Sequence, residues 1–228
     1  MDVYQISLTA INQATEQLTT VSHNVANLNT PGYLATETFH QQLTAANGMA
    51  HSTQQLVDLS QSEIKTTARA LDVAINDDSL FQIQLGQQTL LSRHGKFYLD
   101  QQQFLRHVSG GYVMGVNGKI QLPSQPVTIE ANGTVLAAGD PVAQIATVRL
   151  TQAAQLSAVG DGLYQSPSSN QMVSQANLTP NALNSSNVDA AAQMIKMIEL
   201  SRYLQTEQKV VNAYDGLLQI GINELGKK

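Results

Sequence analysis

The chain has 228 residues, enough for one large domain or two modest ones. Charged residues make up only 13% of it, and its net charge of -5 is not gathered into a basic stripe, which argues against a nucleic acid partner. Cysteine is absent from the sequence, which excludes disulfides, thiolate chemistry and cysteine-ligated metals.

Residues 3–29 carry an apolar repeat with a period of seven. Its first row is Tyr4, Ile11, Leu18 and Val25, and its second row, three residues later each time, is Ser7, Ala14, Val21 and Leu28. This pattern predicts a helix with a heptad seam. Pro31 and Gly32 end it, because proline lacks the amide hydrogen that a helix needs. We assign residues 1–33 to this N-terminal helix.

The polar side of this helix is almost uncharged. Residues 1–36 contain Asp2 and Glu16 but no Lys or Arg, and the remaining polar residues are Gln, Thr, Ser and Asn. Burying an ion costs far more than burying an amide, so this composition suits a helix enclosed on all sides. We therefore expect it to pack against the C-terminal helix and against other subunits. The alternative is an ordinary two-helix hairpin on a sheet.

Between the helices the period changes to two. Residues 80–85 (LFQIQL) alternate cleanly, and short runs at spacings near ten residues follow, separated by Gly, Pro, Asn or Asp. This predicts an antiparallel sheet, sandwich or open barrel over 68–165. Residues 34–67 and 166–186 are polar, and we expect them to be connectors.

A second heptad repeat occupies residues 187–228. Its main row is Ala190, Met197, Leu204, Val211, Leu218 and Leu225, and Met194, Ile198 and Leu200 are expected to broaden the stripe. Ser186 and Asp189 have the spacing of a capping box. Gly216 and Gly221 predict fraying or a break near the end. The predicted fold is therefore α+β: long N- and C-terminal helices pair as a coiled coil around a central antiparallel all-β domain.

Three asparagines follow the N-terminal seam, at positions 24, 27 and 29. An asparagine amide both donates and accepts hydrogen bonds and tolerates the left-handed turn at a helix end. These side chains are thus suited both to cap the helix and to bind other chains. The alternative is that all three serve only the helix end and the turn.

Signals for enzymatic chemistry are weak. None of the five histidines has a close metal-ligand spacing, and no nucleophile elbow or phosphate-binding loop is present. We expect no catalytic residue, cofactor, metal or small-molecule substrate. Two alternatives remain. One is an exported enzyme or binding module whose β domain holds His94, His107 and Asp100 in a cleft, and the other is a coiled-coil adhesin.

The N-terminus has no basic segment followed by an apolar run, so no cleavable secretory signal is expected. No window is apolar enough to predict membrane insertion. The expected location is therefore the cytosol, or outside it by a route that leaves the N-terminus intact.

Both ends of the chain resemble the bacterial flagellar rod and hook proteins. The N-terminal likeness is carried by Ser22, Asn24, Ala26, Asn27, Asn29, Thr30, Gly32 and Tyr33. The C-terminal likeness is carried by 186–189 (SNVD), Met194, Met197, Ile198, Arg202 and 209–211 (KVV). LDVAI (71–75), GKFYLD (95–100) and GDGLY (160–164) are similar to landmarks between them. His23, Gln193 and Leu204 depart from the family's usual residues.

The resemblance implies a structural subunit of the flagellar basal-body rod, with terminal helices around a central channel and β-rich domains outside. It implies a hollow, torque-transmitting shaft through which exported subunits pass. The partners would be other rod subunits, possibly copies of itself, and the flagellar type III export apparatus. The location would be the periplasm-spanning rod. The length favours a rod subunit over a hook protein, and the length with the single modest β domain favours a proximal-rod type over a distal one. The expected interface residues are Ile11, Leu18, Val21, Asn24, Val25, Asn27, Leu28, Asn29, Met197, Leu204, Val211 and Leu218.

Overall fold

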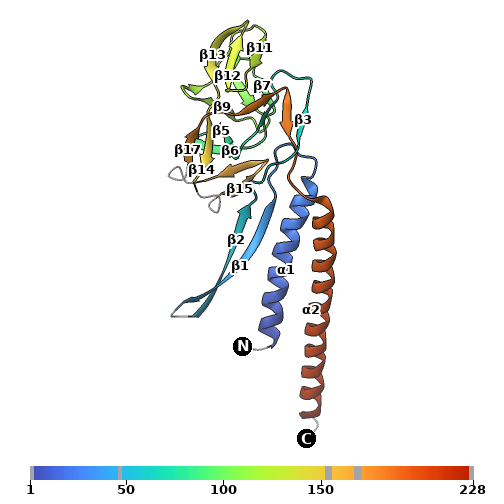
Figure 1. The fold of residues 1–228 in the computed structure, drawn as a ribbon. Coiled ribbons are helices and arrows are strands. Elements are labelled where there is room, and N and C mark those ends of the chain that lie inside the picture. The colour runs from blue at the N-terminus through green and yellow to red at the C-terminus, as the bar shows by residue number, and fades with distance from the viewer. Residues whose placement is uncertain (1–2, 46–47, 152–155, 167–170, 226–228) are drawn as a thin grey trace. The chain divides into compact units, whose positions relative to one another are not determined.

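The computed structural model describes residues 3–45, 48–151, 156–166 and 171–225. The chain divides into two compact units (Figure 1). The first contains residues 1–26, 37–54 and 189–228, and the second contains 27–36 and 55–188. Two helices and a large antiparallel β region make up these units, which confirms the α+β class.

Helices α1 (Val3–Ala26) and α2 (Ala190–Leu225) lie side by side in the first unit (Figure 1). Their direction follows from two contacts. The ring of Tyr4 stacks on that of Tyr214 with centroids 6.4 Å apart, and Asn24 Nδ2 donates to Gln193 Oε1 at 3.4 Å. The start of α1 therefore meets the distal part of α2, so the helices are antiparallel. Their pairing as a coiled coil stays a prediction.

The boundaries of both helices differ from the predicted ones. Helix α1 ends at Ala26 because a turn follows, in which Thr30 N donates to Asn27 O at 3.1 Å. Helix α2 is capped by Asp189, whose Oδ1 accepts from the next amides in the first turn, at 2.9 and 3.1 Å. The predicted capping box starting at Ser186 is therefore wrong by one turn. The expected break is also absent, since α2 continues past Gly216.

Strands form in both segments that were expected to be polar connectors. Strands β1 (Thr36–Ala45) and β2 (Gly48–Val57) pair, β3 (Ile64–Thr66) pairs with β19 (Ala182–Asn184), and β4 (Val73–Ile75) pairs with β18 (Leu178–Pro180). These strands are rich in Gln, Thr and Ser, so apolar and polar residues do not alternate along them. The strands are held by backbone hydrogen bonds to their neighbours, and such bonds leave no periodic pattern in the sequence. The five-segment domain division stays a prediction.

The main sheet has the strand order β15-β16-β6-β5-β9-β8-β7, with β10 on β9 and with β14 joining β5 to β17. Its strands are β5 (Leu80–Leu85), β6 (Gln88–Ser92), β7 (Phe97–Leu99), β8 (Leu105–His107), β9 (Tyr112–Gly115), β10 (Gly118–Lys119), β14 (Thr147–Leu150), β15 (Ser157–Gly160), β16 (Leu163–Gln165) and β17 (Gln171–Ser174). A separate sheet consists of β11 (Val127–Ile129), β12 (Thr134–Ala137) and β13 (Asp140–Gln144). The antiparallel β domain is thus confirmed.

Two apolar cores hold the second unit together. The larger joins the main sheet to strands of the smaller sheets and includes Phe81, Ile83, Phe97 and Val113, all fully buried. The smaller joins Leu34 to strands β5, β6, β14 and β16 and contains the ring of Tyr164. This second core is where the segment that follows α1 is anchored.

Candidate subunit interface

Helix α1 buries a row of small side chains. Ser7, Ala14 and Val21 are seven residues apart and all buried, with Val21 only 2% exposed. The neighbouring predicted row, Ile11, Leu18 and Val25, is half-buried. Small residues in a seam let two helix axes approach closely. The contact row of α1 is therefore the second heptad row.

Helix α2 presents two half-buried rows to this seam. They are Ala190, Met197, Leu204 and Val211, and Gln193, Leu200, Glu207 and Tyr214. Their alternating spacing of three and four residues matches a heptad seam. The expectation that Met194 and Ile198 broaden the stripe is wrong, because they are 51% and 54% exposed. One residue beyond a seam position, a side chain already points off the seam.

Five of the hydroxyl groups of α1 bond to their own helix. The side chains of Thr9, Thr15, Thr19, Thr20 and Ser22 each donate to the carbonyl oxygen four residues earlier, at 2.7–3.1 Å. A hydroxyl that already has a partner loses little when water is removed from it. Between Val3 and Ala26 the helix also carries one acid, Glu16, and no Lys or Arg. Other protein can therefore cover the polar surface of α1 with little loss of hydration free energy.

The three asparagines have three different roles. Asn24 is 1% exposed and bonds to Gln193 of α2. Asn27 lies in the turn beyond the helix, where its Oδ1 accepts from Thr30 Oγ1 at 3.0 Å. Asn29 is exposed. Asn24 thus belongs to the helix and Asn27 to the turn, because α1 ends between them.

Gly32 fixes the turn after α1 against the C-terminal segment. Its amide donates to Asn184 O at 2.8 Å, and its φ of +66° is a conformation that favours glycine. A Cβ at this position would lie 2.5 Å from His94 N, so no side chain fits. We call the part of the second unit formed by residues 27–36 and 182–188 the junction.

Two asparagine side chains hold the junction together. Asn187 Oδ1 accepts from Ala35 N at 2.6 Å, and its Nδ2 donates to Asp58 O at 2.9 Å. Asn184 bonds with both of its amide atoms to the backbone of Ile75, at 2.8 and 2.9 Å. The N-terminal and C-terminal motifs, far apart in sequence, therefore meet here through amides that mimic a backbone ladder.

The other sequence landmarks pack around the same place. The hydroxyl of Tyr164, from GDGLY, accepts from Leu34 N at 2.9 Å, and burial raises the pKa of this tyrosine. In GKFYLD, Gly95 O accepts from Val73 N at 3.0 Å, and a Cβ on Gly95 would overlap Val73 O. Tyr164 and Gly95 are therefore required by their close contacts with the backbone of Leu34 and of Val73.

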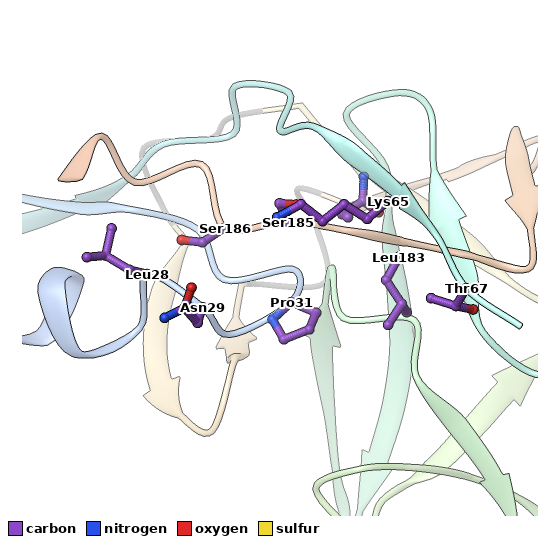
Figure 2. Close-up of a pocket in the computed structure, with 9 residues that line it drawn as sticks. Leu28, Asn29, Pro31, Lys65, Thr67, Leu183, Ser185 and Ser186 are labelled. Carbon is purple, nitrogen blue, oxygen red and sulfur yellow. The ribbon is translucent and has the colours of Figure 1, made fainter. Parts of the chain in front are cut away.

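A pocket of about 230 Å³ opens at the junction (Figure 2). Leu28, Asn29 and Pro31 of the turn line one part, and Lys65, Thr67, Leu183, Asn184, Ser185 and Ser186 line the rest (Figure 2). Ser185 Oγ is buried and has no hydrogen-bond partner among the described residues. The lining is mainly apolar, and Lys65 supplies its one charged side chain.

Eleven of the twelve predicted interface residues fall into two groups. Ile11, Leu18, Val21, Asn24, Val25, Met197, Leu204 and Val211 belong to the helix pair, while Asn27, Leu28 and Asn29 belong to the junction. The side chain of Leu218 lies outside the described residues. Sequence reasoning missed Thr20, whose Oγ1 bonds to Thr38 Oγ1 at 2.6 Å, and the junction asparagines. The role of these residues as a subunit interface stays a prediction.

The side chains named in the enzyme alternative contact other residues of the β domain. His94 and His107 are buried with ring centroids 5.5 Å apart, and burial lowers the pKa of each to about 4. Asp100 instead bonds to Arg106 Nε at 2.8 Å, which lowers the pKa of this carboxyl. Within the described residues there is no group of three or more acidic or histidine side chains placed to hold a metal. The described helices also include none that is long and apolar enough to cross a membrane.

Comparison with known proteins places three regions of the chain in one family. Residues 5–33 match the family of flagella basal body rod proteins, 74–137 match the D1 domain of flagellar hook protein FlgE/F/G, and 179–225 match the C-terminal region of flagellar basal body rod FlgEFG proteins. These regions contain α1 with the turn, much of the β domain, and α2.

Individual relatives match over nearly the whole length. The flagellar basal-body rod protein FlgG of Bacillus subtilis is 30% identical over 91% of this chain and 92% of its own. The flagellar basal-body rod protein FlgF of Escherichia coli is 29% identical over 90% and 91%. The flagellar hook protein FlgE of Brucella abortus matches 75% of this chain but only 43% of its own. The chain belongs to the flagellar basal-body rod protein family, and its relatives support a structural role as a subunit of the rod.

Proposed function

We propose that the chain assembles through its terminal helices into the wall of a hollow rod, with its β domain outside. The observation that carries this proposal is the surface of α1. Exposed Thr and Ser hydroxyls on that helix already bond to their own backbone, and one acid is its whole charge. Hydration stabilises such a surface only slightly, so its burial under neighbouring subunits costs little desolvation free energy.

Within each subunit the helices pair as a coiled coil. The buried row through Ala14 and Val21 supports this arrangement, as do the half-buried rows of α2 with their heptad spacing. Between subunits the predicted interface residues and the face of α1 away from α2 provide the contact. Head-to-tail contacts of this kind generate an open helical filament when the rotation from one subunit to the next does not close into a ring.

The remaining features of the proposal come from the family. The rod transmits torque and lets exported subunits pass through its channel. The flagellar type III apparatus exports the chain without cleaving a signal peptide, and the chain works in the periplasm-spanning rod without enzymatic activity. Its partners are other rod subunits and copies of itself. We assign it a proximal place in the rod.

Charge placed on the two helices tests the proposal. Asn12 and Thr19 are exposed on α1 and two turns apart, so the double variant Asn12→Lys with Thr19→Lys charges the face that we expect to be covered. It should be exported normally but fall at least about tenfold in isolated basal bodies, because each buried ammonium costs several kcal/mol. Export and incorporation are measured separately by immunoblotting.

The matched control places the same two charges on α2, as Gln205→Lys with Asn212→Lys. Both positions are exposed, also two turns apart, and α2 already carries Lys196, Arg202 and Lys209. This variant should be incorporated nearly as well as the wild type. Normal incorporation of the α1 variant would show that its outer face is open to water in the rod, and would refute the proposal.

A further inference from the structure

Two buried histidines lie next to the junction. His94 is 7% exposed and His107 is fully buried, and their rings meet edge to face with centroids 5.5 Å apart. The backbone of Gly32 packs directly on that of His94, because His94 N is the heavy atom that a Cβ on Gly32 would meet first. The histidine pair therefore lies where the turn after α1 is held.

The hydrogen bonds around His107 require a neutral imidazole. The amide of Ser109 donates to His107 Nδ1 at 3.2 Å, so this nitrogen carries no proton. Its Nε2 lies 3.3 Å from Ser92 Oγ, whose own proton is donated to Gly162 O. These bonds assign the single ring proton to Nε2. A second proton, on Nδ1, would turn an acceptor into a donor that faces the amide of Ser109.

His94 has no acceptor for an extra proton either. Its Nε2 is buried and has no hydrogen-bond partner among the described residues. Burial lowers the pKa of His94 and of His107 to about 4, and the positive charge of Lys96 adds to the shift at His94. Arg93, the preceding residue, bonds to Ser79 O at 3.5 Å. Both rings are therefore uncharged near neutral pH.

One carboxylate opposes this effect at His94. It belongs to Asp72, which is already paired with Arg69 at 3.6 Å. The turn itself, residues 27–36, contains no charged residue, and its one titratable side chain is Tyr33. Protonation of both histidines would therefore place two positive charges side by side, near Lys96, with little to balance them.

We propose that the two histidines form an acid-sensitive latch for the turn after α1. Near neutral pH the rings are uncharged and the turn is closed over His94. When both rings take up protons, residues 92–96 open toward water and release the turn, while the larger apolar core stays folded. Local opening costs less free energy than global unfolding, so acid releases the turn first. The inference concerns the single chain and does not depend on its place in a rod.

Hydrogen exchange at single amides tests the latch in the isolated chain. The amides of Gly32 and Leu34 bond within the second unit and report the turn, while the amides of β5 report the sheet. After correction for intrinsic exchange, protection of the turn should fall at least about tenfold from pH 7 to pH 4. At pH 4 the amides of β5 should still be at least about a hundredfold better protected than the turn. Equal protection of the two regions at every pH would overturn the inference.

Histidine variants identify the groups that take up the protons. His94→Gln and His107→Gln should each remove about half of the fall on a logarithmic scale. The matched control is His23→Gln, an exposed position on α1, which should leave the fall unchanged. If the variants do not fold, the ring signals of the wild-type chain replace them in a titration by nuclear magnetic resonance. Both rings should titrate together with the loss of protection, and titration without that loss would refute the latch.

Charge changes beside His94 should move the release in opposite directions. Lys96→Gln removes a positive charge and should shift the release to higher pH, whereas Asp72→Asn removes the opposing carboxylate and should shift it to lower pH. A purely structural role of these residues would not give opposite shifts. Lys119→Gln, at another exposed lysine, is the matched control and should give no shift. If Lys96→Gln leaves the pH of release unchanged or lowers it, the latch is wrong.

Discussion

The two terminal helices have the same heptad period but different surfaces. Helix α1 buries Ala14, Val21 and Asn24, whereas none of the described side chains of α2 is fully buried. Helix α1 has one acid and satisfies its hydroxyls internally, while α2 carries exposed Lys, Arg and Glu together with exposed Met and Ile. A shared period therefore does not mean a shared role.

This difference suggests a division of work in the assembled rod. An uncharged helix is the one that neighbours can enclose on every side, since there is no ion to desolvate. A helix with both charged and apolar exposed residues suits a position where one side meets water and another meets a partner. We therefore expect α1 to be enclosed within the wall of the rod and α2 to keep one side exposed to solvent.

Hydrogen exchange on the isolated chain should give the largest effect. Residues 3–35 and 187–225 should exchange fast and residues 70–165 slowly, because the helices gain most of their packing on assembly. The protection of the two regions should differ by several kcal/mol in opening free energy. Mass spectrometry of exchange in dilute monomer measures this.

The same experiment can contradict the inference that the difference between α1 and α2 reflects assembly. If α1 is strongly protected in the monomer while α2 is not, the buried row of α1 reflects packing within one chain and needs no neighbours. Its difference from α2 would then carry no information on assembly.

The next largest effect is expected when one acidic residue is introduced into each helix in turn. Val21→Asp places a carboxylate at a fully buried seam position of α1 and should cost roughly 3–5 kcal/mol of pairing. Leu204→Asp on α2 is half-buried and has a route to water, so its loss should be smaller. Incorporation into basal bodies measures both, and the melting temperature of the β domain should stay unchanged. Equal losses would mean that both helices are enclosed alike.

The β domain provides a pH-dependent contrast to the helices. Burial lowers the pKa of His94 and His107 from 6.5 to about 4. The charge of Lys96 adds to the shift at His94, where Asp72 opposes it, and the charge of His94 adds to the shift at His107. The unfolded chain therefore takes up protons first as the pH falls. Stability should be complete above pH 6.5 and decline down to about pH 4, by at most on the order of 3 kcal/mol per histidine.

Urea unfolding monitored by the signal of the β domain checks this window at several pH values. The variant His107→Gln removes one titrating group and should flatten the decline by about half. A decline of unchanged slope in that variant would mean that other groups cause it.

Hydrophobic periodicity in the sequence predicted those helices and strands whose apolar residues recur regularly. Strand β5 has the predicted bounds because Phe81 and Ile83 face the core while Gln82 and Gln84 alternate with them. The heptad rows predicted both helices and placed Val21 in the seam for the same reason. Periodicity is local, so a single segment contains all of the information needed.

The junction could not be predicted in this way. Asn184 bonds to Ile75, and Asn187 to Ala35, across more than a hundred residues of sequence. The pocket is built from three separate segments, so no spacing within the chain reveals it. Motif resemblance indicated that residues such as Gly32 matter, but only the fold shows that the backbone of His94 leaves no room for a Cβ.

Asn24 gives the smallest effect, and it tests whether the helices are matched by polarity as well as by shape. Its Nδ2 donates to Gln193 Oε1 at 3.4 Å, and it is almost fully buried. Asn24→Leu should weaken helix pairing by about 1–2 kcal/mol, since the amide of Gln193 loses this partner. Adding Gln193→Leu should recover part of that loss, because two apolar side chains then face each other across the seam. Thermal dissociation of rods built from each variant gives the coupling free energy. Strictly additive losses would show that the 3.4 Å contact contributes nothing, leaving shape alone to match α1 with α2.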